Sequence, residues 1–451
     1  MVKVYAMGMG PLPLEKPRFI HGSCVRTWHF VKGMLEQGHE VCLVASRVNE
    51  NNSTQEQPPF QKTEKGKLTY YLADEVSKYD DPAFHRAIFD EFKPDVIAAI
   101  TTIGCRPIPF LPQGPPLWAD IHGYVMGEAQ LQSEYHRSDG MVYRFWRRYD
   151  EALRRADCFS VTSNIQRHTL IGELGAVGRL NQYTAGYEFV YSIPLAHEAA
   201  EIRKTRDILR GKAIPQDAFV LLWLGGYNLW CDVETLFSAV ETAMSRNERI
   251  HYVSTGGAID GVSEVAYKRL LELVEKSRHR SRYHFQGWVD SADVPNYLLE
   301  ANAGINVDRP CYEAVYGARH RITEMIHAGI PVITTLLTEI SREVVRAGAG
   351  LGSPPQLSGP LAENILQAAD HTGQTLEMGI IGRQLFLEKY TDKITLSPFI
   401  EWLKDPQHAP DWGKEIPWRE NLLYDRLLAR PFKQKVRDFL RNEYIRWKKR
   451  K

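Results

Sequence analysis

Short apolar runs alternate with segments of helical spacing along most of the chain. In the first half, runs with the length and composition of buried strands cover 2–7, 41–45, 95–100, 117–121 and 158–162. Helical spacing covers 23–37, 140–155 and 164–174. The polar stretch 49–67 has no periodicity, so we expect a loop there.

The same alternation resumes in the second half. Strand-like runs cover 219–224, 251–254, 303–307 and 331–335, and helical spacing covers 233–243, 267–277 and 322–328. Between the halves lies a charged segment, 198–210, which we expect to be helical. Strands that alternate with helices favour a parallel sheet covered on both faces. The pattern therefore predicts an α/β protein with two Rossmann-like, doubly wound domains.

We place these domains at 1–195 and 196–390. In open parallel sheets, ligands bind outside the carboxyl ends of the strands. Two such sheets that face each other create one shared interdomain cleft, which suits the joining of two substrates away from water.

The segment 391–451 breaks this alternation. We expect it to cross back towards the first domain and to end in a basic amphipathic helix over 430–451, where only Asp438 and Glu443 oppose the positive charges. Two interpretations stay open for this helix. It either packs on the protein with a solvated basic face, or it lies on an anionic membrane surface.

Composition narrows the class of protein. The chain is 43% hydrophobic and 25% charged, as in ordinary soluble proteins, and its net charge of +1 gives no general attraction for nucleic acid. Its six cysteines form no CxxC pair, which favours buried free thiols in a reducing compartment. No signal peptide and no apolar stretch of membrane-spanning length is visible. We expect a cytoplasmic protein, either free or peripheral on the inner membrane face.

The clearest candidate chemistry lies in 308–335, where a strand end leads through a loop into a short helix. Arg319, Arg321 and Glu324 stand near the start of that helix. A helix N-terminus presents free N–H groups to phosphate, arginines add bidentate donors, and a glutamate can accept both ribose hydroxyls. The alternative is an Arg–Glu ion pair on the surface, which contributes little to the stability of the fold.

The stretch TEMIHAGIPVITT resembles the EAMA-G-PV signature of family-4 glycosyltransferases, which adopt the GT-B fold. Further segments resemble that family in the same order: GHEV at 38–41, ADIHG at 119–123, HYVSTGG at 251–257 and FQGWV at 285–289. The GGYNLW loop together with Arg-x-Arg before the glutamate is similar to a divergent bacterial subgroup linked to polysaccharide gene clusters.

The resemblance implies a donor site in the second domain. Gly225 and Gly226 resemble the loop that lets phosphate approach the backbone, and Trp288 lies in the stretch that lines the base pocket. Glu324, preceded by Thr323, resembles the glutamate that holds the nucleotide ribose.

The first domain supplies candidates on the acceptor side. His122 resembles the family's active-site histidine, although a hydrogen-bonded core histidine is the common alternative. Glu128 follows on the next loop or helix and is a second catalytic candidate. Gly22 and Arg26 belong to the first glycine loop, where an acceptor or a phosphate can rest.

Two departures from the family pattern matter. Tyr316 stands eight residues before Glu324, where the family has a first glutamate. The GGYNLWCD loop also lacks the arginine and lysine that clamp the diphosphate. A diphosphate in a dry cleft still needs neutralising. We therefore infer that Arg319 and Arg321, with Arg309 behind them, take over the clamp.

No metal-binding motif such as HExxH stands out, and the resemblance implies neither a bound metal nor another cofactor. The resulting prediction is transfer of a sugar from a nucleotide-diphosphate sugar to a carbohydrate or lipid-linked acceptor, in glycan or polysaccharide synthesis. The resemblance implies retention at the anomeric carbon, and Tyr316 leaves that stereochemistry open. Two alternatives remain: a nucleotide-sugar epimerase on the same scaffold, and a catalytically silent nucleotide-sugar-binding protein.

Overall fold

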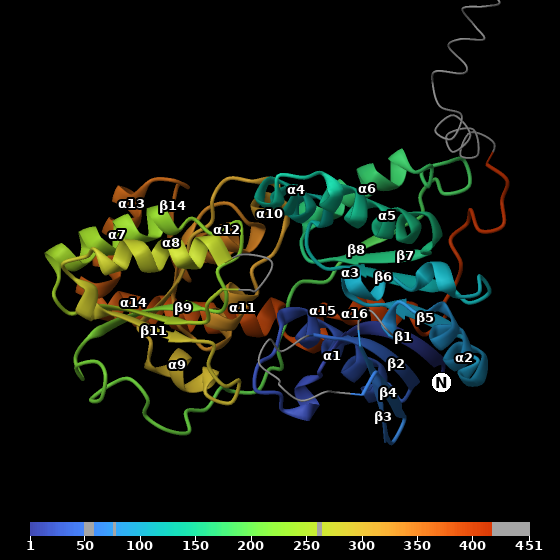
Figure 1. Ribbon diagram of the computed structural model, residues 1–451, viewed down its shortest axis with the longest axis horizontal. Coiled ribbons are helices and arrows are strands. Elements are labelled where there is room, and N and C mark those ends of the chain that lie inside the picture. Colours follow the sequence, from blue (N-terminus) through green and yellow to red (C-terminus); the bar gives the residue numbers. More distant parts are fainter. Residues whose placement is uncertain (49–57, 75–77, 259–263, 417–451) are drawn as a thin grey trace, which may run out of the picture.

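The computed structural model describes residues 1–48, 58–74, 78–258 and 264–416 (Figure 1). Within these residues the chain forms two sheets. The strand order is β3-β4-β2-β1-β5-β6-β7-β8 in the first sheet and β11-β10-β9-β12-β13-β14 in the second. All pairings are parallel except that of β3 with β4. The predicted α/β architecture with two doubly wound sheets is confirmed.

The first sheet and its helices cover the blue to green part of Figure 1. Its strands are β1 (Lys3–Gly10), β2 (Glu40–Arg47), β3 (Phe60–Lys65), β4 (Leu68–Ala73), β5 (Val96–Ala99), β6 (Leu117–Ile121), β7 (Cys158–Val161) and β8 (Val190–Ser192). Its helices are α1 (Gly22–Glu36), α2 (Pro82–Phe92), α3 (Thr101–Gly104), α4 (Val125–His136), α5 (Gly140–Arg155) and α6 (Asn164–Ala176).

The second sheet follows after a long connection. Its strands are β9 (Phe219–Leu224), β10 (Ile250–Thr255), β11 (Tyr283–Gly287), β12 (Ala303–Asn306), β13 (Val332–Thr335) and β14 (Gly350–Ser353). Its helices are α7 (Val233–Arg246), α8 (Glu264–Glu275), α9 (Val294–Glu300), α10 (Tyr312–Tyr316), α11 (His320–His327), α12 (Glu339–Arg346), α13 (Ser358–Asp370) and α14 (Thr372–Lys389). The short helices α15 (Asp392–Thr395) and α16 (Ser397–Trp402) come last.

The central strands are apolar throughout because helices cover both faces of each sheet. Along β1, Tyr5 and Met7 enter one core cluster, whereas Val4 and Ala6 enter another on the opposite face. All six residues of β9 are buried in the same way. Each sheet therefore has two apolar layers, and its strand ends stay free to carry polar groups.

The chain returns to the first sheet after α14. Phe399 of α16 packs against Phe30 and Trp118, with ring centroids 4.9 and 5.2 Å apart, and Leu396 and Leu403 join the same cluster. Residues after the second sheet thus complete the core of the first. The exact division at 195 and 390 stays a prediction. The basic segment 430–451 lies outside the described residues.

Residues 198–210 are not helical, contrary to the prediction. Two buried side chains of α9 take up the backbone N–H groups of this segment. Asn296 accepts from Thr205 and Arg206, and Glu300 accepts from 208, 209 and 210 at 2.8–2.9 Å. These acceptors replace the carbonyls that an α-helix would offer.

Of the predicted loop at 49–67, residues 49–57 lie outside the described residues, and Phe60–Lys65 form the strand β3 instead of a loop. All six residues of β3 are exposed, and the strand is held by an antiparallel ladder with β4. Because neither of its faces is buried, its sequence carries no hydrophobic alternation.

The cysteines form no disulfide: all six are free, five of them buried and Cys311 half-buried. In the part of the chain that the structure describes, no helix has the length and apolar character needed to cross a membrane.

Candidate active site in the interdomain cavity

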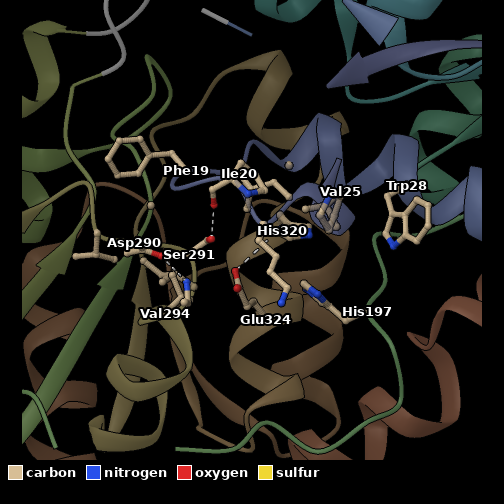
Figure 2. Close-up of a pocket in the computed structure, with 18 of the residues that line it drawn as sticks. Phe19, Ile20, Val25, Trp28, His197, Asp290, Ser291, Val294, His320 and Glu324 are labelled. Carbon is tan, nitrogen blue, oxygen red and sulfur yellow. Dashed lines mark hydrogen bonds and ion pairs between the residues drawn. The ribbon is translucent and has the colours of Figure 1, made fainter. Parts of the chain in front are cut away.

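A cavity of about 530 Å³ lies between the two halves of the molecule (Figure 2). The first half lines it with the loop before α1, through Phe19, and with α1 itself, through Gly22 and Trp28. The second half lines it with the carboxyl ends of β9, β10 and β11 and with one face of α11. The cavity therefore lies where ligands bind in doubly wound sheets.

The two halves touch each other at the cavity. Ser291 follows β11, and its backbone N–H donates to the carbonyl of Arg18 at 2.8 Å. Its hydroxyl donates to the carbonyl of Pro17 at 2.6 Å. Beside this contact the rings of Phe19 and Trp288 meet edge to face, 6.5 Å apart. This contact closes one side of the cavity and limits the access of water.

Two glycines form the floor of the cavity at the ends of β9 and β10. Gly225 has a φ of +82° and Gly256 a φ of +121°, which side-chain-bearing residues rarely adopt. The two backbones nearly touch, since a Cβ on Gly256 would lie 2.4 Å from the carbonyl of Gly225. The absence of side chains there leaves backbone exposed to whatever occupies the cavity.

Glu324 projects into the cavity from α11, and Figure 2 shows it beside His320. Its Oε2 lies 3.8 Å from Nδ1 of His320, and about a quarter of each side chain is exposed. Burial raises the pKa of Glu324 to about 7, against the opposing effect of Arg321. Thr323, the neighbouring donor-site candidate, does not line this cavity. Its buried hydroxyl has no partner among the described residues, and it lines a separate pocket of about 200 Å³.

Trp288 is the most exposed of the predicted donor-site residues, at 41%. Its indole N–H donates to the carbonyl of Ala258 at 3.0 Å, which fixes the ring at the cavity wall. An indole held in this way offers an apolar surface to a flat partner.

The two arginines of the predicted clamp differ in their surroundings. Arg319 is buried and pairs with Asp308 and Glu313 at 2.9 Å each, and its guanidinium lies over Trp230. Burial and these two carboxylates have opposite effects, and the carboxylates prevail, so the pKa of Arg319 is raised. It does not line the cavity. The clamp predicted for Arg319 is therefore not favoured, because its donors hold the α10–α11 region together.

Arg321 and Arg309 lie elsewhere. Arg321 is half-buried, donates to the carbonyl of Gly226 at 2.6 Å and stacks over Trp223 at 4.1 Å. Arg309 donates to the carbonyl of Leu229 and pairs with Glu134 across the domain interface. Arg321 thus contacts the glycine pair, whereas Arg309 and Arg319 contact Leu229 and Trp230 later in the same loop. None of the three arginines lines the cavity, and of the glycine pair only Gly225 does.

The first-domain candidate Arg26 is a buried structural group. It forms a bidentate pair with Asp120, at 3.0 and 2.7 Å, and also donates to the carbonyl of Pro194. Ser160 donates to the same carboxylate at 2.6 Å. Arg26 does not line the cavity, whereas Gly22, four residues earlier, does.

His122 follows β6 and lies behind the first glycine loop. Its Nδ1 is 3.4 Å from the hydroxyl of Ser23. Burial, reinforced by Arg26, lowers the pKa of His122 to about 4, so its imidazole is neutral. The side chain does not line the cavity itself.

Glu128 faces the second half of the molecule rather than the cavity. Burial and the nearby Glu313 of α10 raise the pKa of Glu128 to about 7, and a hydrogen bond with Gln132 acts against them. Beside it, α4 approaches α10 so closely that a Cβ on Gly127 would lie 2.8 Å from the backbone nitrogen of Glu313. Glu128 thus belongs to the contact between the two halves.

Two cavity residues were not predicted from the sequence. His197 and His320 lie beside Glu324, and one ligand atom from each of the three lies within 4.8 Å of the others. His197 belongs to no helix or strand and stands 123 positions from His320, so no local motif joins them. His320 adjoins Arg319 and Arg321, which is the one signal in the sequence that could have pointed to it.

The sequence matches no protein-family model and no curated protein. Solved structures do match. Sucrose-phosphate synthase from Thermosynechococcus elongatus has a TM-score of 0.67 at 16% identity, covering 90% of this chain and 99% of that one. The trehalose-6-phosphate structure from E. coli, bound with UDP-2-fluoro glucose, has a TM-score of 0.63 at 11% identity, covering 90% and 100%. Anabaena HepE in complex with UDP and glucose has a TM-score of 0.59 at 14% identity, with the same coverage.

The chain has the GT-B fold. At these identities the likeness extends to the architecture alone.

Proposed function

We propose that this protein is a glycosyltransferase that uses a nucleotide-diphosphate sugar as donor. The observation that carries the proposal is the cavity itself. It is closed between two doubly wound sheets and combines bare glycine backbone at two strand ends with a carboxylate on α11 and an exposed indole. Bare backbone suits a phosphate, a carboxylate suits the hydroxyls of a ribose, and an indole suits a base.

Each part of the donor has a matching group. Trp288 offers a surface next to the base, and Glu324 accepts hydrogen bonds from the ribose hydroxyls. The Gly225–Gly226 loop lets the diphosphate approach the backbone, and Arg321 stands beside that loop. As the sugar bond breaks, negative charge collects on the leaving diphosphate, and fixed donors and cations stabilise it there.

The acceptor binds on the side of Gly22 and the loop before α1. The contact of Ser291 with Arg18 and Pro17 keeps water from the reacting bond, which favours transfer over hydrolysis. We propose a carbohydrate or lipid-linked acceptor in glycan or polysaccharide synthesis, supported by the sequence resemblance to a bacterial polysaccharide subgroup. UDP is the first nucleotide to test, since two of the similar structures hold UDP or a UDP sugar.

A donor screen tests the proposal. Nucleotide sugars with different bases are added to the purified protein, and the melting temperature is recorded, because a ligand that binds the folded state raises it. We expect a UDP sugar to raise it and UDP release to require an acceptor. Absence of a shift with every nucleotide sugar would refute the proposal.

The two alternatives give different results in the same assay. An epimerase converts the sugar nucleotide without any acceptor, and the product is visible by NMR. A silent binding protein shows the thermal shift but no turnover with any acceptor of a glycan array.

A further inference from the structure

His197, His320 and Glu324 converge on one point inside the cavity. His320 and Glu324 are four residues apart on α11, so they share one face of the helix. His197 approaches from the connection between the sheets, with its ring centroid 4.6 Å from that of His320. Figure 2 shows the three side chains next to one another at the cavity wall.

The position of His197 is fixed, yet its Nε2 is unused. Its ring stacks on His327 at 5.2 Å, and His327 is held by a hydrogen bond to the carbonyl of Ala200. The Nε2 atom of His197 is buried and has no hydrogen-bond partner among the described residues. A buried polar atom without a partner is costly, so an ion or a water that bonded to this nitrogen would stabilise the site.

The three groups are suitable ligands for a transition-metal cation. Two imidazoles and one carboxylate are a recurrent set for Zn²⁺, with the fourth position open to a substrate atom. The ligand atoms lie within 4.8 Å of one another. Each needs to move by only roughly 0.7 Å to reach the usual distance of 2.0–2.2 Å from a central ion.

The donor needs a positive charge at this place. Residues 225–232, which form the glycine loop and its continuation, contain no lysine or arginine. Arg319 is held by Asp308 and Glu313, and Lys32 of the cavity wall by Asp392 and Glu198 at 2.8 Å each. Among the cations near the glycine loop and the cavity, these pairs leave Arg321 and the exposed Lys16 to neutralise the charge of a diphosphate.

We propose that His197, His320 and Glu324 bind one divalent transition-metal cation, Zn²⁺, and that its open position takes a diphosphate oxygen of the donor. The second clause rests on the proposed function, whereas the first stands without it. Glu324 binds the ion through Oε2, the oxygen that faces His320, and its other oxygen stays available to a ribose hydroxyl. The ion replaces part of the missing basic clamp.

Metal binding is tested with Co²⁺, whose visible absorption reports its ligands, and with Zn²⁺ by calorimetry. The full-length protein is first freed of metal with a chelator. We expect one ion per chain, and binding weakened at least about tenfold in His197→Ala, His320→Ala and the isosteric Glu324→Gln. The control is His136→Ala, an exposed histidine at the end of α4. Circular dichroism checks that each variant is folded.

The proposed metal site would be refuted if all three folded variants bound the metal as tightly as the parent protein does. It would also be refuted if the parent protein bound no metal. The nucleotide clause has its own test, in which UDP is titrated with and without saturating Zn²⁺. We expect Zn²⁺ to strengthen UDP binding at least about tenfold, and His320→Ala to abolish this gain. Zn²⁺ that binds at the three residues without affecting UDP would refute the nucleotide clause. No UDP binding under either condition would instead count against the proposed function.

Discussion

We propose Arg321 as the basic residue beside the donor diphosphate, because it donates to the carbonyl of Gly226 in the glycine loop. We predict that Arg321→Ala weakens UDP binding about 10- to 100-fold, since a hydrogen bond to a charged group contributes about 1.5–3 kcal/mol. Calorimetry with UDP measures the change. The matched control is Arg346→Ala, at the end of α12, whose guanidinium donates to the carbonyl of Arg342 and not to the glycine loop, and which should bind UDP as the parent does. Equal affinities would place the diphosphate elsewhere.

The raised pKa of Glu128 predicts that the stability of the protein depends on pH. A free glutamate titrates near 4.3, whereas burial and Glu313 raise the pKa of Glu128 to about 7. Between these values the folded state binds more protons than the unfolded state, so this residue lowers the free energy of unfolding as pH rises to about 7. Glu128→Gln should therefore be more stable at pH 8, by about 1–3 kcal/mol, and unchanged at pH 4.5.

Denaturant unfolding at several pH values measures this difference. Glu134→Gln, on the exposed face of the same helix, is the control, because its pair with Arg309 is largely solvated. If Glu128→Gln and the parent protein gave parallel curves across this pH range, Glu128 would not titrate at the domain contact.

The limits of sequence prediction are clearest at single residues. Arg26, Arg319 and Arg321 look equivalent in the sequence, but Arg26 pairs with Asp120 and Arg319 with Asp308 and Glu313 in the folded protein. Which arginine stays available depends on buried carboxylates, and Asp120 comes from a distant strand. Gly225, Trp288 and Glu324 were predicted through the motif order, and they do line the cavity.

At the level of elements, α4 and α10 make a close helix contact between the two halves. A Cβ on Gly127 would lie 2.8 Å from the backbone of Glu313. In an isolated helix Gly→Ala stabilises by about 1 kcal/mol. Here we predict the opposite sign for Gly127→Ala, a loss of about 1–3 kcal/mol together with lower transferase activity, because overpacking pushes the helices apart.

Gly172 provides the matched control. It is an exposed glycine of α6 with open space around its missing Cβ. Gly172→Ala should stabilise the protein by about 0.5–1 kcal/mol and leave activity unchanged. Thermal unfolding and an activity assay measure both variants. If both substitutions stabilised the protein equally, a methyl group at Gly127 would not overpack the contact between α4 and α10.

The elements that the sequence failed to predict share a cause. Buried strands and amphipathic helices leave a periodic pattern, and most of them were located correctly. Strand β3 lacks such a pattern, since its six residues are exposed, and it is held by backbone hydrogen bonds to β4 and by the ring of Phe60 against Tyr71 and Phe84. Residues 198–210 have a helical composition, but Asn296 and Glu300 bind their N–H groups. In both segments, contacts with residues distant in sequence determine the local structure.

At the scale of the whole molecule, several segments join the two halves, among them three that lie far apart in the sequence. The connection after β8 carries His197 into the cavity, the loop after β11 contacts Arg18 and Pro17, and α15 and α16 return to the first core. The cavity is therefore shaped by segments that are distant in sequence. This explains why the order of motifs could place Gly225, Trp288 and Glu324 at one site, whereas it could not place the two histidines beside Glu324.

The returning helix α16 gives the last prediction. Phe399 is fully buried among Phe30 and Trp118 of the first core, although it follows the second sheet in the chain. Phe399→Ala should lower the free energy of unfolding by about 3–5 kcal/mol, the usual cost of a large cavity. Ile394→Ala on α15, a residue that is 47% exposed, should change it by less than about 0.5 kcal/mol. Urea unfolding followed by circular dichroism measures both variants. A loss in Phe399→Ala as small as that in Ile394→Ala would mean that the first half folds without the returning segment.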